Sequence, residues 1–173
     1  MSCSSADAVL FATREELAGL SDAEIVTAAS AAKAACNEGQ FLLLLVNNSG
    51  QPPLTRSLQS HASREKFMAT SLVRGGHGVP FDNTSLVSAI AKRRAEHAAL
   101  MGYPHHAAYQ LTEQTVGSVD TLNRLLAQLA APAVANARKE QAAMQAVVDA
   151  EKDGFALRAA DWPYYTERVR AAR

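Results

Sequence analysis

The order of hydrophobic and polar residues along the chain predicts a fold made mostly of helices. Apolar residues recur three or four positions apart over long stretches, as one buried face of a helix requires. Pro132 lies inside the longest stretch, so we expect a kink or break just before it. The expected helices occupy residues 14–19, 22–37, 54–60, 62–74, 84–101, a stretch beginning at Pro104, 118–152 and 161–170.

Polar residues mark several of the expected helix starts. In a capping box, a Ser or Thr and a Glu three residues later each bind the other's backbone N–H. Thr13 and Glu16 form one such pair, and Ser21 and Glu24 form another. Asp161 stands directly before the last helical pattern and is expected to cap that helix. The sequence therefore predicts helix starts at three places with a physical reason for each.

A continuous apolar run at residues 41–46 is the one convincing strand pattern. It is too short for a typical helix, and Gly39 and the turn residues 47–50 bound it. A strand needs a partner, and Phe155-Ala156-Leu157 is the best candidate within the chain. The alternative is that part of the natural sheet is missing. The predicted fold is therefore mainly α, a multi-helix bundle with about seven helices and one short strand or hairpin near 41–46.

The helical stripes also name the residues expected to form the core. Cys36 lies on the stripe of 22–37, and we interpret it as a small core residue, because a reactive thiol needs basic neighbours and exposure. Arg94 falls among apolar residues of 84–101, where a buried arginine is usually paired internally. The other residues on the expected apolar stripes are Ile25, Ala28, Ala29, Ala32, Phe67, Leu72, Val73, Val87, Ile90, Ala91, Ala98, Met101, Leu122, Leu125, Leu126, Leu129, Met144, Val147 and Val148.

Composition and charge exclude several classes of function. The 173 residues carry 17 basic and 17 acidic side chains, and a net charge of zero argues against a nucleic-acid surface. No apolar run reaches the ~20 residues of a membrane span, and the N-terminus has no basic region typical of a secretory signal. Cys3 and Cys36 are too few for a disulfide framework. We expect a cytoplasmic protein with residues 1–173 in a single helical domain.

The five histidines do not form a recognisable metal motif. None begins a His-Glu-x-x-His sequence, and no two stand three or four positions apart. A site assembled from His97, His105 or His106 and Glu113 would have no spacing signature. His77 lies in a turn-rich stretch and is interpreted as a surface loop residue. We therefore predict no metal ligands and no cofactor in this chain.

The best polar constellation lies in the stretch that begins at Pro104. His106, Gln110 and Glu113 share one helical face at i, i+4 and i+7. They form either a solvated helix face or an acid/base pair that lines a cleft. Neighbouring His105 and Tyr109 complete the candidate catalytic set of His106, Glu113, His105 and Tyr109.

Several segments, in one order along nearly the whole chain, resemble one family of enzymes. The family is that of the thimet-oligopeptidase-like zinc metallopeptidases, and the similarity is greatest to its bacterial peptidyl-dipeptidases. The segments that carry the resemblance run from Phe11 to Ser21, Asn47 to Pro52, Ser63 to Phe67, Asp82 to Thr84, Arg94 to Pro104 and Ala107 to Tyr109, and include Asp161, Trp162 and Tyr165.

The resemblance implies a large, mainly helical parent enzyme with two halves on either side of a substrate channel. In that family zinc sits on a His-Glu-x-x-His helix in a later part of the sequence. This chain resembles a middle stretch from the non-catalytic channel wall and stops at Arg173, before the zinc region. No family metal ligand or catalytic glutamate has a counterpart here, so we expect no zinc peptidase chemistry from this chain alone.

Three functional hypotheses follow from the resemblance. The first is a truncated peptidyl-dipeptidase-like protein that binds a peptide-like or small organic ligand, or a protein partner. The second is a repurposed metal-independent enzyme, suggested by His97, His106 and Tyr109 where relatives usually carry other residues. The third is one piece of a split zinc metallopeptidase. Because the parent buries this segment, we also expect exposed apolar surface covered by a homodimer or another protein.

Overall fold

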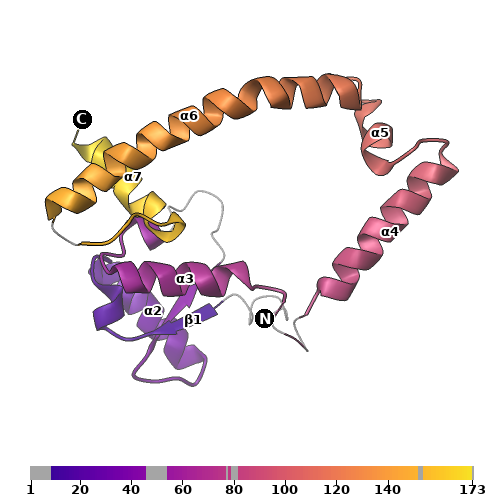
Figure 1. The fold of residues 1–173 in the computed structure, drawn as a ribbon. Helices are drawn as coiled ribbons and strands as arrows, with labels where there is room; N and C mark the ends of the chain where they lie inside the picture. Colours follow the sequence, from indigo (N-terminus) through magenta and orange to yellow (C-terminus); the bar gives the residue numbers. More distant parts are fainter. Residues whose placement is uncertain (1–8, 46–53, 77, 79–81, 152–153, 173) are drawn as a thin grey trace. The chain divides into compact units, whose positions relative to one another are not determined.

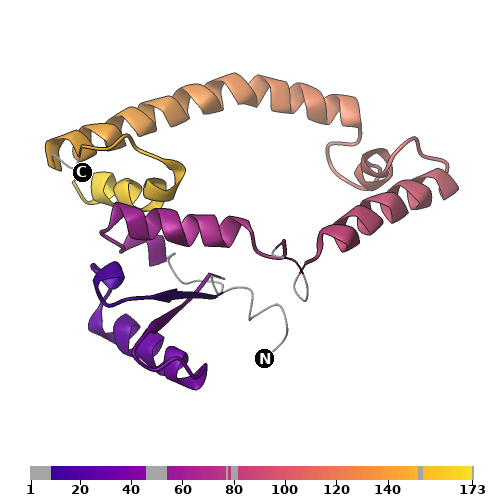
Figure 2. The ribbon, with the colours of Figure 1, turned by 60° about the horizontal axis from the view of Figure 1, so that its bottom comes forward.

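The computed structural model describes residues 9–45, 54–76, 78, 82–151 and 154–172, and these residues are mainly α-helical (Figures 1 and 2). The predicted fold class is confirmed. The elements, with η denoting 3₁₀ helices, are β1 (Val9–Ala12), η1 (Glu15–Leu17), α2 (Asp22–Ala34), β2 (Phe41–Leu44), η2 (Leu54–Arg56), α3 (His61–Leu72), α4 (Thr84–Leu100), α5 (His106–Leu111), α6 (Val119–Glu151), η3 (Ala159–Asp161) and α7 (Trp162–Ala171).

The chain divides into two compact units. Unit 1 contains residues 1–81 and 140–173, and unit 2 contains residues 82–139. The long helix α6 contributes its first part to unit 2 and its last part to unit 1. The single domain expected over residues 1–173 stays a prediction, and each unit is described by itself below. His77 lies outside the described residues.

Unit 1 begins with a two-stranded antiparallel sheet. β1 pairs with β2 in a register that places Val9 opposite Leu44 and Ala12 opposite Phe41. The strand predicted at 41–46 is confirmed over 41–44, but the partner suggested at residues 155–157 is wrong. That segment lies elsewhere in unit 1, where the backbone N–H of Leu157 donates to the Gln145 side chain.

Both predicted capping boxes are present. The Glu24 carboxylate accepts from the Ser21 backbone N–H at 2.8 Å, and the Ser21 hydroxyl accepts from the Glu24 backbone N–H at 3.4 Å. Thr13 and Glu16 make the same pair of bonds at 2.8 and 3.5 Å. The α-helix expected after Thr13 is shorter than predicted, because the described structure there is the single 3₁₀ turn η1.

The first core of unit 1 lies between the sheet and its neighbouring helices. Its buried members are Ala12, Leu17, Leu20, Ala28, Leu43, Leu45, Leu58 and Phe67. Ala28 and Phe67 were predicted core residues, but Leu72 and Val73 are exposed, because α3 ends there. Cys36 is also exposed: α2 ends at Ala34, so the helical stripe stops before it.

The second core of unit 1 forms where the end of α6 meets the C-terminal segment. Met144 and Val148 of α6 pack with Leu157 and with Tyr165 of α7, and all four are buried. The expected long helix is confirmed as α6. The helix continues through Pro132, so of the kink or break expected there, the break is absent.

Unit 2 consists of α4, α5 and the first part of α6. Ala98 is the one buried residue among residues 82–139, all of which the structure describes. Val87, Ile90 and Met101, which were expected in a core, are exposed, and so is Arg94. Most of unit 2 therefore lacks the tightly packed interior that the apolar stripe predicted.

Gly19 and Gly39 have similar φ angles, but only Gly19 lies close to another part of the backbone. Comparing substitutions at the two positions therefore distinguishes the cost of backbone strain from the cost of a steric clash. Gly19 and Gly39 have φ angles of +98° and +89°, a region that side chains disfavour. A Cβ on Gly19 would lie 2.0 Å from the Ser57 carbonyl oxygen, whereas a Cβ on Gly39 would meet nothing within 4 Å. We predict that Gly39→Ala lowers the free energy of unfolding by about 1–2 kcal/mol. Gly19→Ala is predicted to cost about 3 kcal/mol or more, because the backbone must also move.

Urea denaturation followed by circular dichroism measures both glycine variants. Gly39→Ala is the matched control, since it carries the φ penalty without the clash. Equal losses of unfolding free energy in the two variants would contradict the close approach of Gly19 to Ser57.

Candidate functional site

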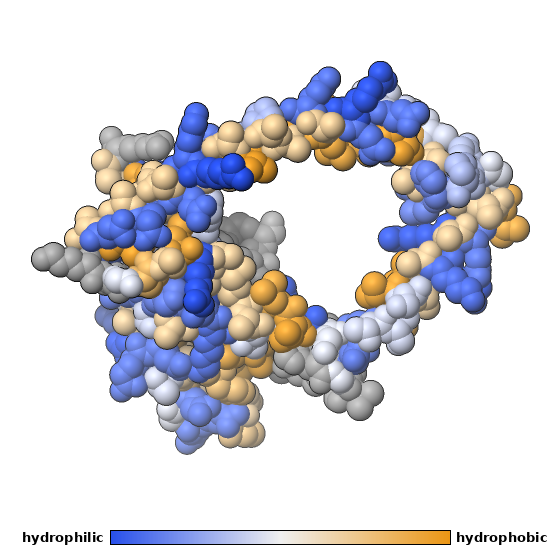
Figure 3. Space-filling model, viewed as in Figure 1, coloured by the Kyte–Doolittle hydropathy of each residue, from blue (hydrophilic) through white to orange (hydrophobic). Residues whose placement is uncertain are grey.

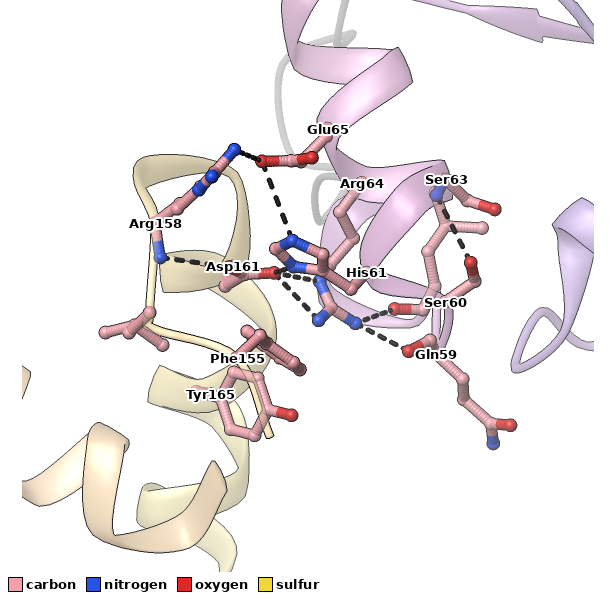
Figure 4. Close-up of polar contacts among 12 residues, drawn as sticks. Gln59, Ser60, His61, Ser63, Arg64, Glu65, Phe155, Arg158, Asp161 and Tyr165 are labelled. Carbon is pink, nitrogen blue, oxygen red and sulfur yellow. Dashed lines mark hydrogen bonds and ion pairs between the residues drawn. The ribbon is translucent and has the colours of Figure 1, made fainter. Parts of the chain in front are cut away.

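Asp161 is the centre of a polar cluster in unit 1 (Figure 4). Its side chain is completely buried at the end of η3. Oδ1 accepts from Nε of Arg64 at 2.8 Å and lies 2.8 Å from Nδ1 of His61. Oδ2 accepts from the backbone N–H of Arg158 at 3.0 Å. Because a carboxylate only accepts hydrogen bonds, Nδ1 of His61 carries the hydrogen in this contact.

The Arg64 side chain is buried as completely as Asp161. Its Nη1 donates to the carbonyl oxygens of Leu58 at 2.9 Å and Gln59 at 2.7 Å, and its Nη2 lies 2.8 Å from Asp161 Oδ1. The guanidinium carbon also lies 4.6 Å from the ring centre of Tyr164, within cation–π range. All three guanidinium nitrogens therefore have partners, as a buried charge requires.

The outer part of the cluster is also occupied by internal contacts. The His61 ring stacks on Phe155 with 4.1 Å between ring centres, and its side chain is 25% exposed. Glu65 accepts from Arg158 Nη1 at 2.6 Å and lies 3.6 Å from His61 Nε2. Since these polar groups bind one another, we interpret the cluster as a structural link between α3 and residues 154–172.

This cluster was not predicted from the sequence. Asp161 was expected to cap α7, but its side chain makes no cap hydrogen bond to that helix. It accepts a hydrogen bond from Arg64 instead. The sequence predicted a buried, internally paired arginine at Arg94. Arg94 is exposed, and Arg64 is the buried and paired arginine instead. The one available signal was that the segments containing Arg64 and Asp161 both belong to the resemblance.

We predict that Asp161→Asn lowers the free energy of unfolding by about 3–5 kcal/mol, because Arg64 keeps its buried charge and loses the compensating carboxylate. Arg158→Ala is the control: it removes a partly exposed ion pair with Glu65, worth about 0–1 kcal/mol. Urea denaturation measures both variants. A small, equal effect of the two substitutions would mean that Asp161 is not the main link.

An open hollow in unit 2 lies between α4 and α5. Its volume is about 320 Å³, and the lining residues are Leu86, Ala89, Ile90, Arg93, Arg94, His97 and His106. Aromatic contacts join the two helices beside it. The Tyr109 ring centre lies 5.0 Å from that of His97 and 5.4 Å from that of Tyr103, both edge to face.

Of the four candidate catalytic residues, His106 lines this hollow, and His105, Tyr109 and Glu113 do not. Nδ1 of His106 is buried without a hydrogen-bond partner among the described residues. His105 is the N-cap of α5, where its Nδ1 accepts from the Ala108 backbone N–H at 3.1 Å. Tyr109 lies 6.4 Å from His106 between ring centres.

Glu113 is exposed beyond the end of α5 at Leu111, so the helical face expected to align it with His106 does not extend that far. The catalytic roles of His106, Glu113, His105 and Tyr109 stay predictions. In the described part of the chain, no group of three or more His, Cys, Asp or Glu side chains is arranged to hold a metal ion. No helix among the described residues is long and apolar enough to cross a membrane.

Two carboxyl groups in unit 1 have pKa values lowered by basic neighbours. The hydrogen bond from Lys66 lowers the pKa of Glu16, and the hydrogen bond from Arg170 lowers the pKa of Glu167. A lowered pKa in the folded state stabilises the fold above the unfolded-state pKa, and this contribution is lost as the pH falls through the folded value. Both pairs are at the surface, so the contribution is small.

Comparison with known proteins assigns the chain to a family. Residues 54–173 match Peptidase family M3. The chain is 31% identical over 155 residues to dipeptidyl carboxypeptidase of Escherichia coli (strain K12), an alignment that covers 90% of this chain and 23% of that protein. It is 32% identical over 154 residues to dipeptidyl carboxypeptidase of Salmonella typhimurium (strain LT2), covering 89% of this chain and 22% of the relative. The chain thus spans less than a quarter of the length of these relatives. The match over most of its residues confirms the resemblance, and the chain belongs to Peptidase family M3.

Proposed function

We propose that these 173 residues form a non-catalytic segment of the M3 peptidase type that binds a polypeptide, either a peptide or a protein surface, through unit 2. The observation that carries the proposal is the exposed apolar surface of that unit. The proposal excludes zinc hydrolysis by this chain alone, because its sequence contains no His-Glu-x-x-His motif to hold and use the metal.

Apolar side chains lie at the surface along α4 and α6 (Figure 3). On α4, Val87 is 64% exposed and Ile90 is 50% exposed. On α6, Leu129 is 55% exposed, and Leu125 and Leu126 are similarly accessible. Large apolar side chains exposed in this number are typical of surfaces that another protein covers, because their burial releases ordered water.

Membership in a peptidase family supports a polypeptide as the bound class. The two named relatives are dipeptidyl carboxypeptidases. The matched region includes all of unit 2, so its helices derive from a protein whose family acts on peptide chains. Family membership, together with the exposed leucine, isoleucine and valine side chains, supports binding of an apolar segment of a peptide or protein.

We predict that Ile90→Asp and Leu129→Asp each weaken peptide binding about tenfold, because a carboxylate placed on the apolar surface must lose water when the peptide covers it. Fluorescence anisotropy with labelled ten-residue peptides of equal charge and increasing apolar content measures the affinity. Mass spectrometry of the same mixtures, with zinc added, is expected to show the peptides uncleaved.

Leu72→Asp is the matched control, since Leu72 is 74% exposed but lies on α3 in unit 1. Affinity that does not rise with apolar content, or that Leu72→Asp lowers as much as Ile90→Asp, would contradict the proposal. Sedimentation velocity on the same samples identifies a homodimer: if a second copy covers unit 2, Leu129→Asp yields monomers.

A second candidate is completion of an M3 peptidase by a separate polypeptide, which the limited coverage of the relatives favours. We predict for this case that adding the chain restores peptide hydrolysis to the E. coli dipeptidyl carboxypeptidase from which the matched quarter is deleted. Restored hydrolysis that Leu129→Asp abolishes would support completion, and absent hydrolysis alongside peptide binding would favour the first proposal.

A further inference from the structure

We infer that a second copy of this chain covers the first part of α6, as an antiparallel pair of α6 helices with Leu129 at the twofold axis. This inference rests on the proposed function and names the protein surface that unit 2 binds. A twofold contact of this kind brings the same residues of both copies together, with the two chain directions opposed.

The first part of α6 carries its leucines on one side of the helix. At about 100° per residue, they share an arc about 100° wide with one alanine. We call this set the α6 stripe, and its members are Leu122, Leu125, Leu126, Leu129 and Ala133. Leu125, Leu126 and Leu129 are 46%, 54% and 55% exposed. The exposed leucines are therefore arranged as a surface that one straight partner helix can cover.

The last part of α6 shows that this side of the helix is a packing surface. Met144 follows Leu126 by 18 residues, about five turns, and so lies on the same side of the helix. Met144 is buried against the C-terminal segment, where Leu157 and Tyr165 belong to its cluster. The α6 stripe thus continues a surface that is already covered further along the same helix.

The charged side chains between residues 119 and 138 lie away from the α6 stripe. Asp120, Arg124 and Arg138 project from the opposite side of the helix, about 150–170° from the centre of the stripe. A second copy therefore covers the leucines without burying a charge, whose desolvation would oppose association.

An antiparallel pair brings large side chains opposite small ones. With the axis at Leu129, Leu125 comes level with Ala133 of the partner subunit. Large and small side chains that alternate across an interface interdigitate and let two helices approach closely. A parallel pair would place leucine against leucine and alanine against alanine, which leaves gaps beside the alanines.

The ends of the antiparallel pair are complementary in charge. Glu140, the first carboxylate on the side of the stripe, comes level with Ser118 of the partner subunit, where the partner's α6 begins. The N-terminus of a helix favours a negative charge, and the twofold axis produces this contact twice. The overlap of residues 119–139 is roughly 30 Å long at about 1.5 Å per residue. Because the match extends over this whole length, it favours a second copy over an unrelated peptide.

Analytical ultracentrifugation over a range of protein concentrations tests for the pair. We expect dimers whose fraction rises with concentration. Leu129→Asp is expected to raise the dissociation constant about hundredfold or more, because two carboxylates then meet at the axis and lose water. Val134→Asp is the matched control, since Val134 is 50% exposed on the same helix but lies about 130° from the centre of the stripe. It is expected to leave the dissociation constant unchanged.

Cysteine cross-linking tests the direction and register of the pair. In a chain with Cys3→Ser and Cys36→Ser, Leu129→Cys is expected to form a disulfide between the two copies under mild oxidation, because residue 129 faces its own copy at the axis. Leu122→Cys is the control. The antiparallel pair places residue 122 roughly 20 Å along the helix from its own copy, too far for a disulfide.

A monomer at every concentration would overturn the inference. Equal effects of Leu129→Asp and Val134→Asp, cross-linking of both cysteine variants, or cross-linking of neither would also overturn it. The proposed function survives any of these results if peptides still bind unit 2 and Ile90→Asp weakens them. If the chain is monomeric and no peptide binds, both the inference and the proposed function are wrong.

Discussion

The buried ion pair of Arg64 and Asp161 is the contact on which the organisation of unit 1 depends. A charged group removed from water is tolerated only when its partners are complete, because desolvation costs several kcal/mol per ion. Here the partners come from separate parts of the chain: α3 supplies Arg64 and His61, the turn before α3 supplies two carbonyl groups, and residue 158 supplies a backbone N–H. Satisfying one carboxylate therefore fixes the position of α3 relative to residues 154–172.

The two units differ in how they are stabilised. Unit 1 has two buried apolar clusters and the ion pair, so removal of apolar surface from water accounts for its cohesion. Unit 2 has only Ala98 fully buried, and its apolar residues remain at the surface. This contrast connects the fold to the proposed function, because the surface that unit 2 does not bury within itself is the surface through which we propose that it binds a polypeptide.

Local signals in the sequence predicted local structure well. The capping boxes at Thr13 and Ser21 are present because their bonds span only three residues, and α6 has nearly the predicted ends. The pattern of hydrophobic and polar residues did not predict contacts between residues far apart in the sequence. Neither the pairing of β2 with residues 9–12 nor the contact of Arg64 with Asp161, 97 positions away, has a periodic signature.

The candidate site could be predicted only in part for the same reason. His106 was selected for its helical spacing, and it does line the hollow. Its supposed companion Glu113 depended on a helix continuing past Leu111, where α5 ends. Arg94 was expected to be buried and paired, because it lies within an apolar stripe of 84–101. It is exposed, since unit 2 provides too few packing partners to bury that stripe.

Pro132 has a consequence for the long helix that contains it. Proline lacks an N–H, so the carbonyl of Gln128 loses its donor four residues later, and the cost within a helix is about 3 kcal/mol. The surrounding residues offset this cost through intrinsic helix propensity, since the neighbours include Ala130, Ala131, Ala133, Ala135 and Ala137. All of these alanines lie outside the buried clusters, so this stretch of α6 owes its helicity to backbone preference more than to packing. Amide hydrogens around Pro132 are accordingly expected to exchange with solvent faster than those around the buried Met144 and Val148.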